Sequence, residues 1–90
     1  MVAITGHMAE FRFFRPEAHN VFLVGDFNSW DSKMLPMVRT RDGHWFARVN
    51  LPAGDFRFRY RADDQWFIDY AAFGLETGPF GLDSVVHIQG

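Results

Sequence analysis

The three tryptophans stand at positions where a hydrophobic core does not require them. Trp30 lies within the polar segment NSWDS, and Trp66 follows the acidic pair Asp63-Asp64. Trp45 begins a predicted strand. A flat, rigid indole on a surface provides a large contact area at a low cost in conformational entropy. Such rings stack on the apolar C–H faces of sugars, whose hydroxyl groups then need hydrogen-bonding partners, so these residues favour recognition of a sugar.

Polar side chains that could supply those partners neighbour the tryptophans or share a predicted strand face. The candidates for this rim are Arg59, Gln65, Asn28 and Lys33. Guanidinium and amide groups suit hydroxyl recognition because they donate hydrogen bonds in a planar arrangement. The competing interpretation is that Trp30 and Trp66 only cover the ends of a β-sandwich. The residue pattern alone leaves both interpretations open.

The sequence lacks the set of titratable residues that an active site needs. Its four histidines are scattered without metal-ligand spacing, and no serine lies in a nucleophile elbow. Cysteine is absent, which excludes disulfides, thiol nucleophiles and thiolate metal sites. Asp63 and Asp64 carry carboxylates that calcium accepts, but two adjacent carboxylates on a turn do not define a site. We therefore expect no enzymatic activity, no catalytic residue, no cofactor and no metal.

Charge and hydropathy narrow the classes of partner. The formal net charge is −2, which gives no general attraction to nucleic acid or to an anionic membrane. Arg57, Arg59 and Arg61 form a local basic run, but aspartates flank it, as on a solvated strand face. No apolar stretch approaches the roughly 20 residues of a membrane span. We expect neither nucleic acid nor membrane as a partner.

The N-terminal segment MVAITGHMAE lacks the basic region and apolar core of a secretory signal, so we expect a cytoplasmic protein. Its Gly-His-Met tripeptide is typical of a cloning scar. We therefore expect residues 1–9 to be disordered or tag-derived, and residues 10–90 to form one domain, since ninety residues suffice for one domain.

Short apolar or alternating bursts separated by turn residues predict an all-β fold. The predicted strands are residues 10–15, 21–26, 37–40, 44–51, 55–62, 65–68 and 84–89. About seven short strands with closely spaced turns indicate an immunoglobulin-like antiparallel β-sandwich. A long loop is expected over 69–82, and residues 70–76 allow one helical turn.

The segment 55–62 has the clearest alternation in the chain. Its aromatic residues fall on one face, and its three arginines fall on the other. Aromatic residues make up 18% of the sequence, as a small domain with a dense core requires. The aromatic face of this strand is therefore expected to line the inside of the sandwich.

The order of motifs resembles the family 48 carbohydrate-binding modules. These are early-set immunoglobulin-like domains of glycogen branching enzymes, of isoamylases and of the AMP-activated kinase β subunit. The matching positions, within residues 10–88, are Gly25, Phe27, Asn28, Trp30, Leu35-Pro36, Leu51-Pro52, Gly54, Phe56, Tyr60, Trp66 and Asp69. The resemblance implies an early-set sandwich and a non-catalytic module that binds α-1,4-glucan.

The resemblance also implies roles for particular residues. Trp30 and Trp66 match two tryptophans that stack on glucose units, and Arg59 matches a strand lysine that bonds to hydroxyl groups. Gly25 would permit a backbone bend, and Phe27 would fill the sandwich.

The sequence departs from the family before its last strand. Asp83 aligns with a sugar-binding asparagine, and Gly81 replaces a threonine. Phe80 or Leu82 would have to replace a leucine through a different geometry. Together with Lys33, the predicted carbohydrate-binding residues are Trp30, Arg59, Trp66, Leu82 and Asp83.

Two functions follow from these features. The first is a module that binds glycogen or starch-like α-glucan with micromolar to millimolar affinity, as expected for two stacking platforms. The alternative is a sandwich that interacts with protein, such as a docking module beside a glycan-active enzyme. Both indoles exposed on one face with Arg59 between them would favour the sugar. A free-standing protein, a piece of a longer chain and any oligomeric state all fit the sequence.

Overall fold

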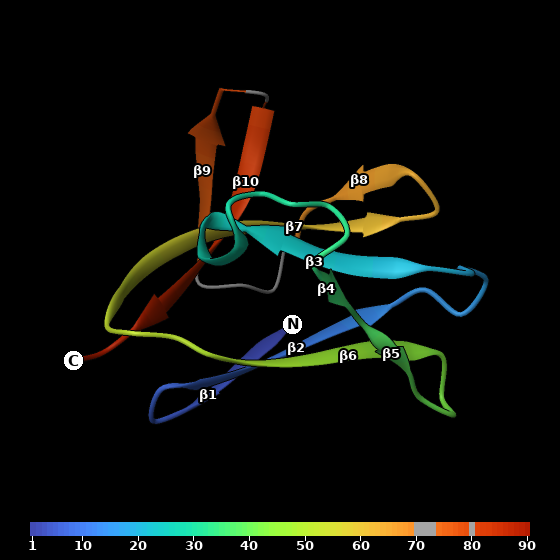
Figure 1. Ribbon diagram of the computed structural model, residues 1–90, viewed down its shortest axis with the longest axis horizontal. Helices are drawn as coiled ribbons and strands as arrows, with labels where there is room; N and C mark the ends of the chain where they lie inside the picture. The colour runs from blue at the N-terminus through green and yellow to red at the C-terminus, as the bar shows by residue number, and fades with distance from the viewer. Residues whose placement is uncertain (70–73, 80) are drawn as a thin grey trace.

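The computed structural model describes residues 1–69, 74–79 and 81–90 (Figure 1). These ranges contain ten strands and one short 3-10 helix, η1 (Asp26–Asn28). The strands are β1 (Val2–Thr5), β2 (Met8–Phe14), β3 (Val21–Gly25), β4 (Leu35–Pro36), β5 (Val38–Arg39), β6 (His44–Asn50), β7 (Gly54–Ala62), β8 (Gln65–Phe67), β9 (Gly74–Gly78) and β10 (Gly81–Ile88).

The strands of the described chain form two antiparallel sheets packed as a sandwich. One sheet has the order β1-β2-β6-β5, and the other has the order β4-β3-β7-β10-β9. Strand β7 is central to the second sheet: it pairs with β3 on one side, and with β10 and then β8 on the other. In Figure 1, β2 and β6 run below β3 and β7. The predicted all-β early-set sandwich is confirmed.

Aromatic rings from the facing sheets fill the core. Phe11 of β2 meets Phe58 of β7 edge-on, with ring centroids 5.0 Å apart, and Phe13 stacks on Tyr60 at 4.5 Å. Such ring pairs add stability beyond the area they bury. The predicted inward face of β7 is therefore confirmed. Trp45 is also buried in this core, so its expected position outside a core is wrong.

Buried polar groups join β7 to the segment that follows β8. The Tyr60 hydroxyl donates to Asp69 Oδ2 at 2.7 Å, and the Asp69 backbone N–H donates to Ser84 Oγ at 3.3 Å. Ser84 Oγ in turn donates to the carbonyl oxygen of Phe58 at 2.6 Å. Burial, with the Asp69 charge nearby, raises the pKa of Tyr60 well above its usual value, so the phenol stays a donor.

The N-terminal residues form a strand where we expected a disordered or tag-derived segment. β1 pairs with β2 from Val2↔Phe11 to Thr5↔Met8, and Val2 and Ile4 pack against the core. Gly6, with φ of 60°, makes the intervening turn possible. Long-range packing of two apolar side chains therefore orders this segment. A tag origin for residues 1–9 stays a prediction.

The expected loop over 69–82 contains β9 and the start of β10. β9 pairs with β10 from Gly74↔Val85 to Gly78↔Gly81. Most of the β9 side chains are exposed, so its sequence lacks the alternation of apolar and polar residues that predicts a half-buried strand. The suggested helical turn over 70–76 lies partly outside the described residues, and residues 74–76 are strand.

Gly25 ends β3 in an extended conformation, with φ −173° and ψ −171°. The expected bend at Gly25 is therefore wrong, and the chain turns at Ser29 and Trp30, both with φ of 56°. Glycine is needed for space, because a Cβ here would lie 2.5 Å from the Arg57 carbonyl oxygen and 2.9 Å from the Phe27 ring. Phe27 packs against the core, as predicted.

Replacing Gly25 with alanine should destabilise the fold by about 1–3 kcal/mol, because the added methyl group forces the β3–β7 backbones apart. Urea unfolding followed by circular dichroism measures this change. Gly74→Ala is the matched control, since no described atom lies within 4 Å of a Cβ there. Equal stability of the two variants would contradict the packing argument.

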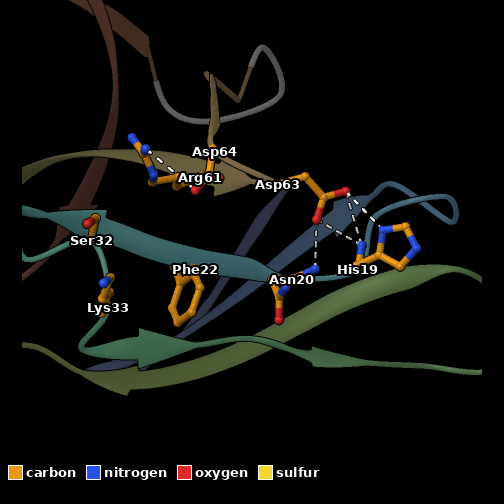
Figure 2. A pocket seen from close by; sticks show the side chains of 8 residues that line it. All are labelled: His19, Asn20, Phe22, Ser32, Lys33, Arg61, Asp63 and Asp64. Atoms are coloured by element: carbon orange, nitrogen blue, oxygen red, sulfur yellow. Dashed lines mark hydrogen bonds and ion pairs between the residues drawn. The ribbon is translucent and has the colours of Figure 1, made fainter.

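The β7–β8 hairpin is tied to the loop before β3 by one carboxylate. Asp63 Oδ1 accepts the backbone N–H groups of Asn20 at 2.9 Å and His19 at 3.0 Å (Figure 2). Asp63 and Asp64 have φ of 47° and 68°, a left-handed pair suited to a two-residue hairpin turn. The hydrogen bonds from Asn20 and then His19 lower the pKa of Asp63 below its ordinary value of 3.8.

Asp63→Asn should lower the melting temperature at pH 7, because the amide accepts the same hydrogen bonds without a charge. Because the pKa of Asp63 is lower in the folded than in the unfolded protein, its ionised carboxylate stabilises the fold above pH 3.8. This stabilisation is lost as the pH falls through the lowered pKa. The difference in melting temperature should therefore narrow below pH 3.8. A melting-temperature difference that stays constant from pH 7 to pH 2 would refute the link between the Asp63 charge and stability. Glu76→Gln, on the exposed strand β9, is the control for loss of a charge alone.

Candidate functional site

A groove of about 540 Å³ lies on the outer face of the β7 sheet, away from the core. The residues that line it are Trp30, Arg57, Arg59, Trp66, Pro79 and Asp83. Two of them follow from alternation: because Phe58 points into the core, Arg57 and Arg59 must point outward. The groove is therefore a direct consequence of the packing of β7.

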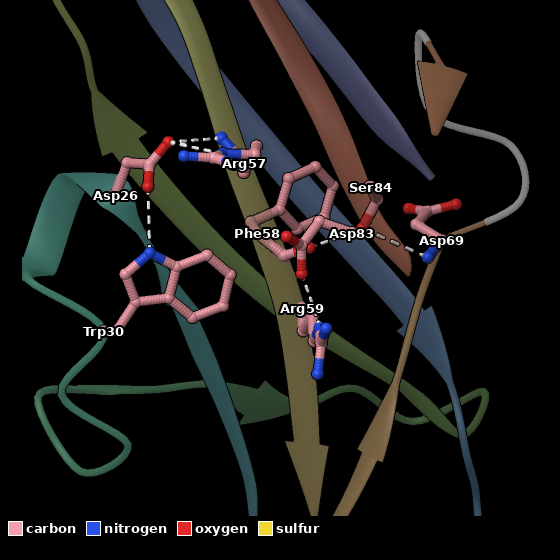
Figure 3. Close-up of polar contacts among 8 residues, drawn as sticks. All are labelled: Asp26, Trp30, Arg57, Phe58, Arg59, Asp69, Asp83 and Ser84. Carbon is pink, nitrogen blue, oxygen red and sulfur yellow. Dashed lines mark hydrogen bonds and ion pairs between the residues drawn. The ribbon is translucent and has the colours of Figure 1, made fainter. Parts of the chain in front are cut away.

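Trp30 is held at one end of the groove by Asp26. The indole N–H of Trp30 donates to Asp26 Oδ1 at 2.8 Å, and Asp26 Oδ2 accepts the backbone N–H of Arg57 at 2.8 Å (Figure 3). A bulky residue with positive φ is unusual, and such conformations cluster at binding sites. Trp30 as a whole residue is 36% exposed. Its polar edge is thus occupied while its apolar surface remains open.

Trp66 stands at the other end of the groove, on β8. It pairs with Arg61 of β7, and the Arg61 guanidinium carbon lies 4.7 Å from the centroid of its ring. This cation–π contact covers one face of the indole. Trp66 is 42% exposed, so the other face remains available to a ligand.

Arg59 lies between the two indoles and is paired with Asp83. Trp30 is tied through Asp26 to Arg57, and Trp66 stacks on Arg61, so Arg59 is the middle arginine on the same strand face. The two outer arginines, Arg57 and Arg61, are four positions apart, which is about 13 Å along a strand. This arrangement meets the condition that we set for a sugar site.

The Arg59–Asp83 pair forms the floor of the groove. Arg59 Nε donates to Asp83 Oδ1 at 2.6 Å, and the two side chains are only 13% and 4% exposed. A Cβ at Gly78 would overlap the Asp83 carboxylate, so glycine makes room for it. Since Nε is used by Asp83, the terminal Nη groups of Arg59 are the donors left for a ligand.

The structure brings four of the six predicted binding residues to this groove: Trp30, Arg59, Trp66 and Asp83. Leu82 is 47% exposed but precedes Asp83 in β10, and neighbouring strand residues point to opposite faces. Lys33 lines a separate hollow on the same sheet. The alternative assignment of Phe80 lies outside the described residues.

Sequence reasoning missed four residues that shape the groove: Asp26, Arg57, Arg61 and Pro79. The alternation in 55–62 already placed both arginines beside Arg59, but we read them as a solvated face. Each arginine instead has a carboxylate partner, with Nε of Arg57 at 3.7 Å from Asp26 and Nη2 of Arg61 at 3.7 Å from Asp64.

Within the described ranges, no group of three or more histidine, aspartate or glutamate side chains could hold a metal ion. None of the helices in these ranges has the length and apolar character to cross a membrane.

Asp26→Ala should release the Trp30 indole, because its N–H loses the acceptor that fixes it. Among the three indole N–H groups, that of Trp45 is bonded to the Arg15 carbonyl in a part-buried position, on a side chain that is itself buried, and should exchange with water slowest. In the variant, the Trp30 indole should exchange as fast as that of Trp66, and the fold should lose about 1–2 kcal/mol.

The measurement is hydrogen exchange of the indole N–H signals by NMR. Asp31→Ala is the matched control, because this neighbouring carboxylate accepts only the Lys33 backbone N–H in the described structure. Unchanged Trp30 exchange in Asp26→Ala, or equal acceleration in the control, would show that Asp26 does not hold the ring.

The family described as carbohydrate-binding module 48 (isoamylase N-terminal domain) matches residues 3–79. A 1,4-alpha-glucan branching enzyme of Lactobacillus acidophilus is 42% identical over 83 residues, which cover 87% of this chain and 13% of the enzyme. That of Pseudoalteromonas atlantica is 42% identical over 55 residues, or 60% of this chain and 7% of the enzyme. That of Dictyostelium discoideum is 40% identical over 42 residues, or 47% of this chain and 6% of the enzyme.

The chain thus spans 13% or less of the length of these three enzymes. The family match, by contrast, extends over both sheets and over the segments that carry Trp30, Arg59 and Trp66. It confirms the resemblance drawn from the order of motifs: the chain belongs to the carbohydrate-binding module 48 family.

Proposed function

We propose that this protein is a non-catalytic module that binds α-glucan chains in the groove between Trp30 and Trp66. The observation that carries the proposal is that two half-exposed indoles line one groove with Arg59 between them. Membership of a carbohydrate-binding family supports a sugar ligand. The three relatives named above are 1,4-alpha-glucan branching enzymes, and their names support an α-glucan.

Each side chain in the groove has a distinct task in this proposal. Trp30 and Trp66 stack on the C–H faces of two glucose units. Trp30 uses the ring surface that its hydrogen bond to Asp26 leaves free, and Trp66 uses the ring face that Arg61 does not cover. Arg59 donates from its Nη groups to hydroxyls of the units between them. Asp83 is too buried to contact much of a sugar, so it acts as a positioning residue that orients Arg59.

The charges of the groove suit an uncharged ligand. Arg59 is neutralised by Asp83, and Arg57 faces Asp26. An anionic ligand would have to compete with these carboxylates for the guanidinium groups. A neutral polyhydroxyl chain needs donors and acceptors but no net charge, so the groove fits a glucan better than a phosphate-rich polymer.

The second partner class that we propose is a glycan-active enzyme. The chain matches small parts of enzymes at least several times its length. A module that holds a glucan beside such an enzyme raises the local concentration of substrate by a chelate effect. The alternative is a docking role without sugar binding, and the sugar titration described below distinguishes it from glucan binding.

Trp66→Ala and Trp30→Ala should each weaken binding of maltoheptaose by about tenfold or more, because a stacked aromatic contributes about 1–3 kcal/mol. Tryptophan fluorescence titrated with maltoheptaose and β-cyclodextrin measures the affinity, with cellohexaose as the control sugar. We expect saturation with the two α-glucans alone in the micromolar to millimolar range.

Phe14→Ala is the matched control variant, since Phe14 is an exposed aromatic residue on the other sheet. It should bind maltoheptaose as the unmodified protein does. If the folded protein shows no fluorescence change at millimolar α-glucan, and calorimetry detects no heat, the glucan proposal fails. The docking module is then the better account.

A further inference from the structure

A second hollow of about 740 Å³ lies on the same outer sheet face and is not used by the groove described above. Its lining includes Asn20, Phe22, Lys33, Arg61 and Asp64. Figure 2 shows Phe22 on β3 with Lys33 toward one end and Asn20 toward the other, while Arg61 and Asp64 lie across the strand. The hollow is therefore framed by residues from three separate segments of the chain.

We propose that this hollow is a second glucan subsite, contiguous with the first groove, that binds the continuation of the same chain. This inference rests on the proposed function. It predicts that the protein recognises extended α-glucan chains more tightly than short ones, and it gives Lys33 a role that the first groove does not.

The two sites meet at the Arg61–Trp66 contact. The outer face of the sheet carries Phe22, Arg61 and Trp66 in one row, because Phe22 pairs with Arg61 and Arg61 pairs with Trp66. Arg61 lines the second hollow, and Trp66 lines the first groove. Since the guanidinium lies against one face of the indole, only the width of the Trp66 ring separates the two sites, and a chain on the free face reaches Arg61 by crossing the edge of that ring.

The chemistry of the hollow suits a sugar unit. Phe22 is half-buried and supplies an apolar surface for a C–H face. Lys33 has no ion-pair partner within the described ranges, so its three N–H donors remain for hydroxyl groups. The exposed Asn20 side chain adds an amide donor and an acceptor.

Mixed charge disfavours ionic ligands in this hollow. Lys33 and Arg61 would repel a metal cation, and the Asp63 and Asp64 carboxylates would repel a phosphate or an acidic peptide. The rim is also preformed, because Asp63 fixes the backbone of residues 19 and 20 through its hydrogen bonds. Preformed polar groups lose little entropy when a neutral ligand binds.

The test compares maltotriose with maltoheptaose on the double variant Asn20→Ala, Lys33→Ala. Both side chains are exposed, so their removal should leave the fold intact. The unmodified protein should bind maltoheptaose more tightly than maltotriose. The double variant should lose about tenfold in maltoheptaose affinity, as expected for two lost hydrogen-bonding groups, and retain its affinity for maltotriose.

Isothermal calorimetry gives the affinities, and NMR signals locate the chain. Maltoheptaose, but not maltotriose, should shift the backbone amide signals of residues 19–20 and 32–33. Arg39→Ala, Asn50→Ala is the matched control, since it removes one cation and one amide from exposed positions on the other sheet. It should bind both sugars as the unmodified protein does.

The outcomes separate this inference from the proposed function. Binding of both sugars with equal affinity, or an unchanged maltoheptaose affinity in the double variant, would overturn the second subsite and leave the first groove standing. Loss of maltotriose affinity in the double variant would also overturn it, because the residues would then belong to the first groove. Failure of the unmodified protein to bind either sugar would overturn both proposals.

Discussion

The side chains of β7 point alternately to the two faces of its sheet, and both the core and the groove depend on this alternation. Phe58 and Tyr60 pack against Phe11 and Phe13 of the other sheet, which fixes the register of the strand. The three arginines between and beside them must then lie on the outer face. A slip of one residue would bury the arginines and expose the rings, so the energy of the core also enforces the position of the groove.

The groups that face the groove are each held by a second side chain. Asp26 fixes the edge of Trp30, Arg61 covers one face of Trp66, and Asp83 orients Arg59. Side chains that are already ordered lose less entropy on binding, and this saving raises affinity without any new contact. The left-handed backbone at Trp30 carries a conformational cost that persists only because the surrounding hydrogen bonds impose it.

The alternation of residues 55–62 and the order of motifs sufficed to predict the sandwich, the inward face of β7 and the positions of Trp30, Trp66 and Arg59. Features set by pairing between distant segments could not be read in this way. β1 is ordered by its register with β2, and β9 by its register with β10, although neither sequence carries a distinctive period. The face to which Leu82 points depends on where β10 begins. Position 25 requires glycine because the Arg57 carbonyl oxygen of the neighbouring strand occupies the space of a side chain.

Charge compensation on the outer sheet face explains why this chain carries aspartate rather than asparagine at position 83. A guanidinium group stays charged at any physiological pH, and Arg59 is too buried for water to solvate it fully. A neutral amide beside it would leave that charge uncompensated in a region of low dielectric, which is costly. A carboxylate removes the cost and leaves the pair uncharged as a whole. Arg59 and Asp83 therefore act as one unit, because removing either charge alone would leave the other uncompensated beneath the groove.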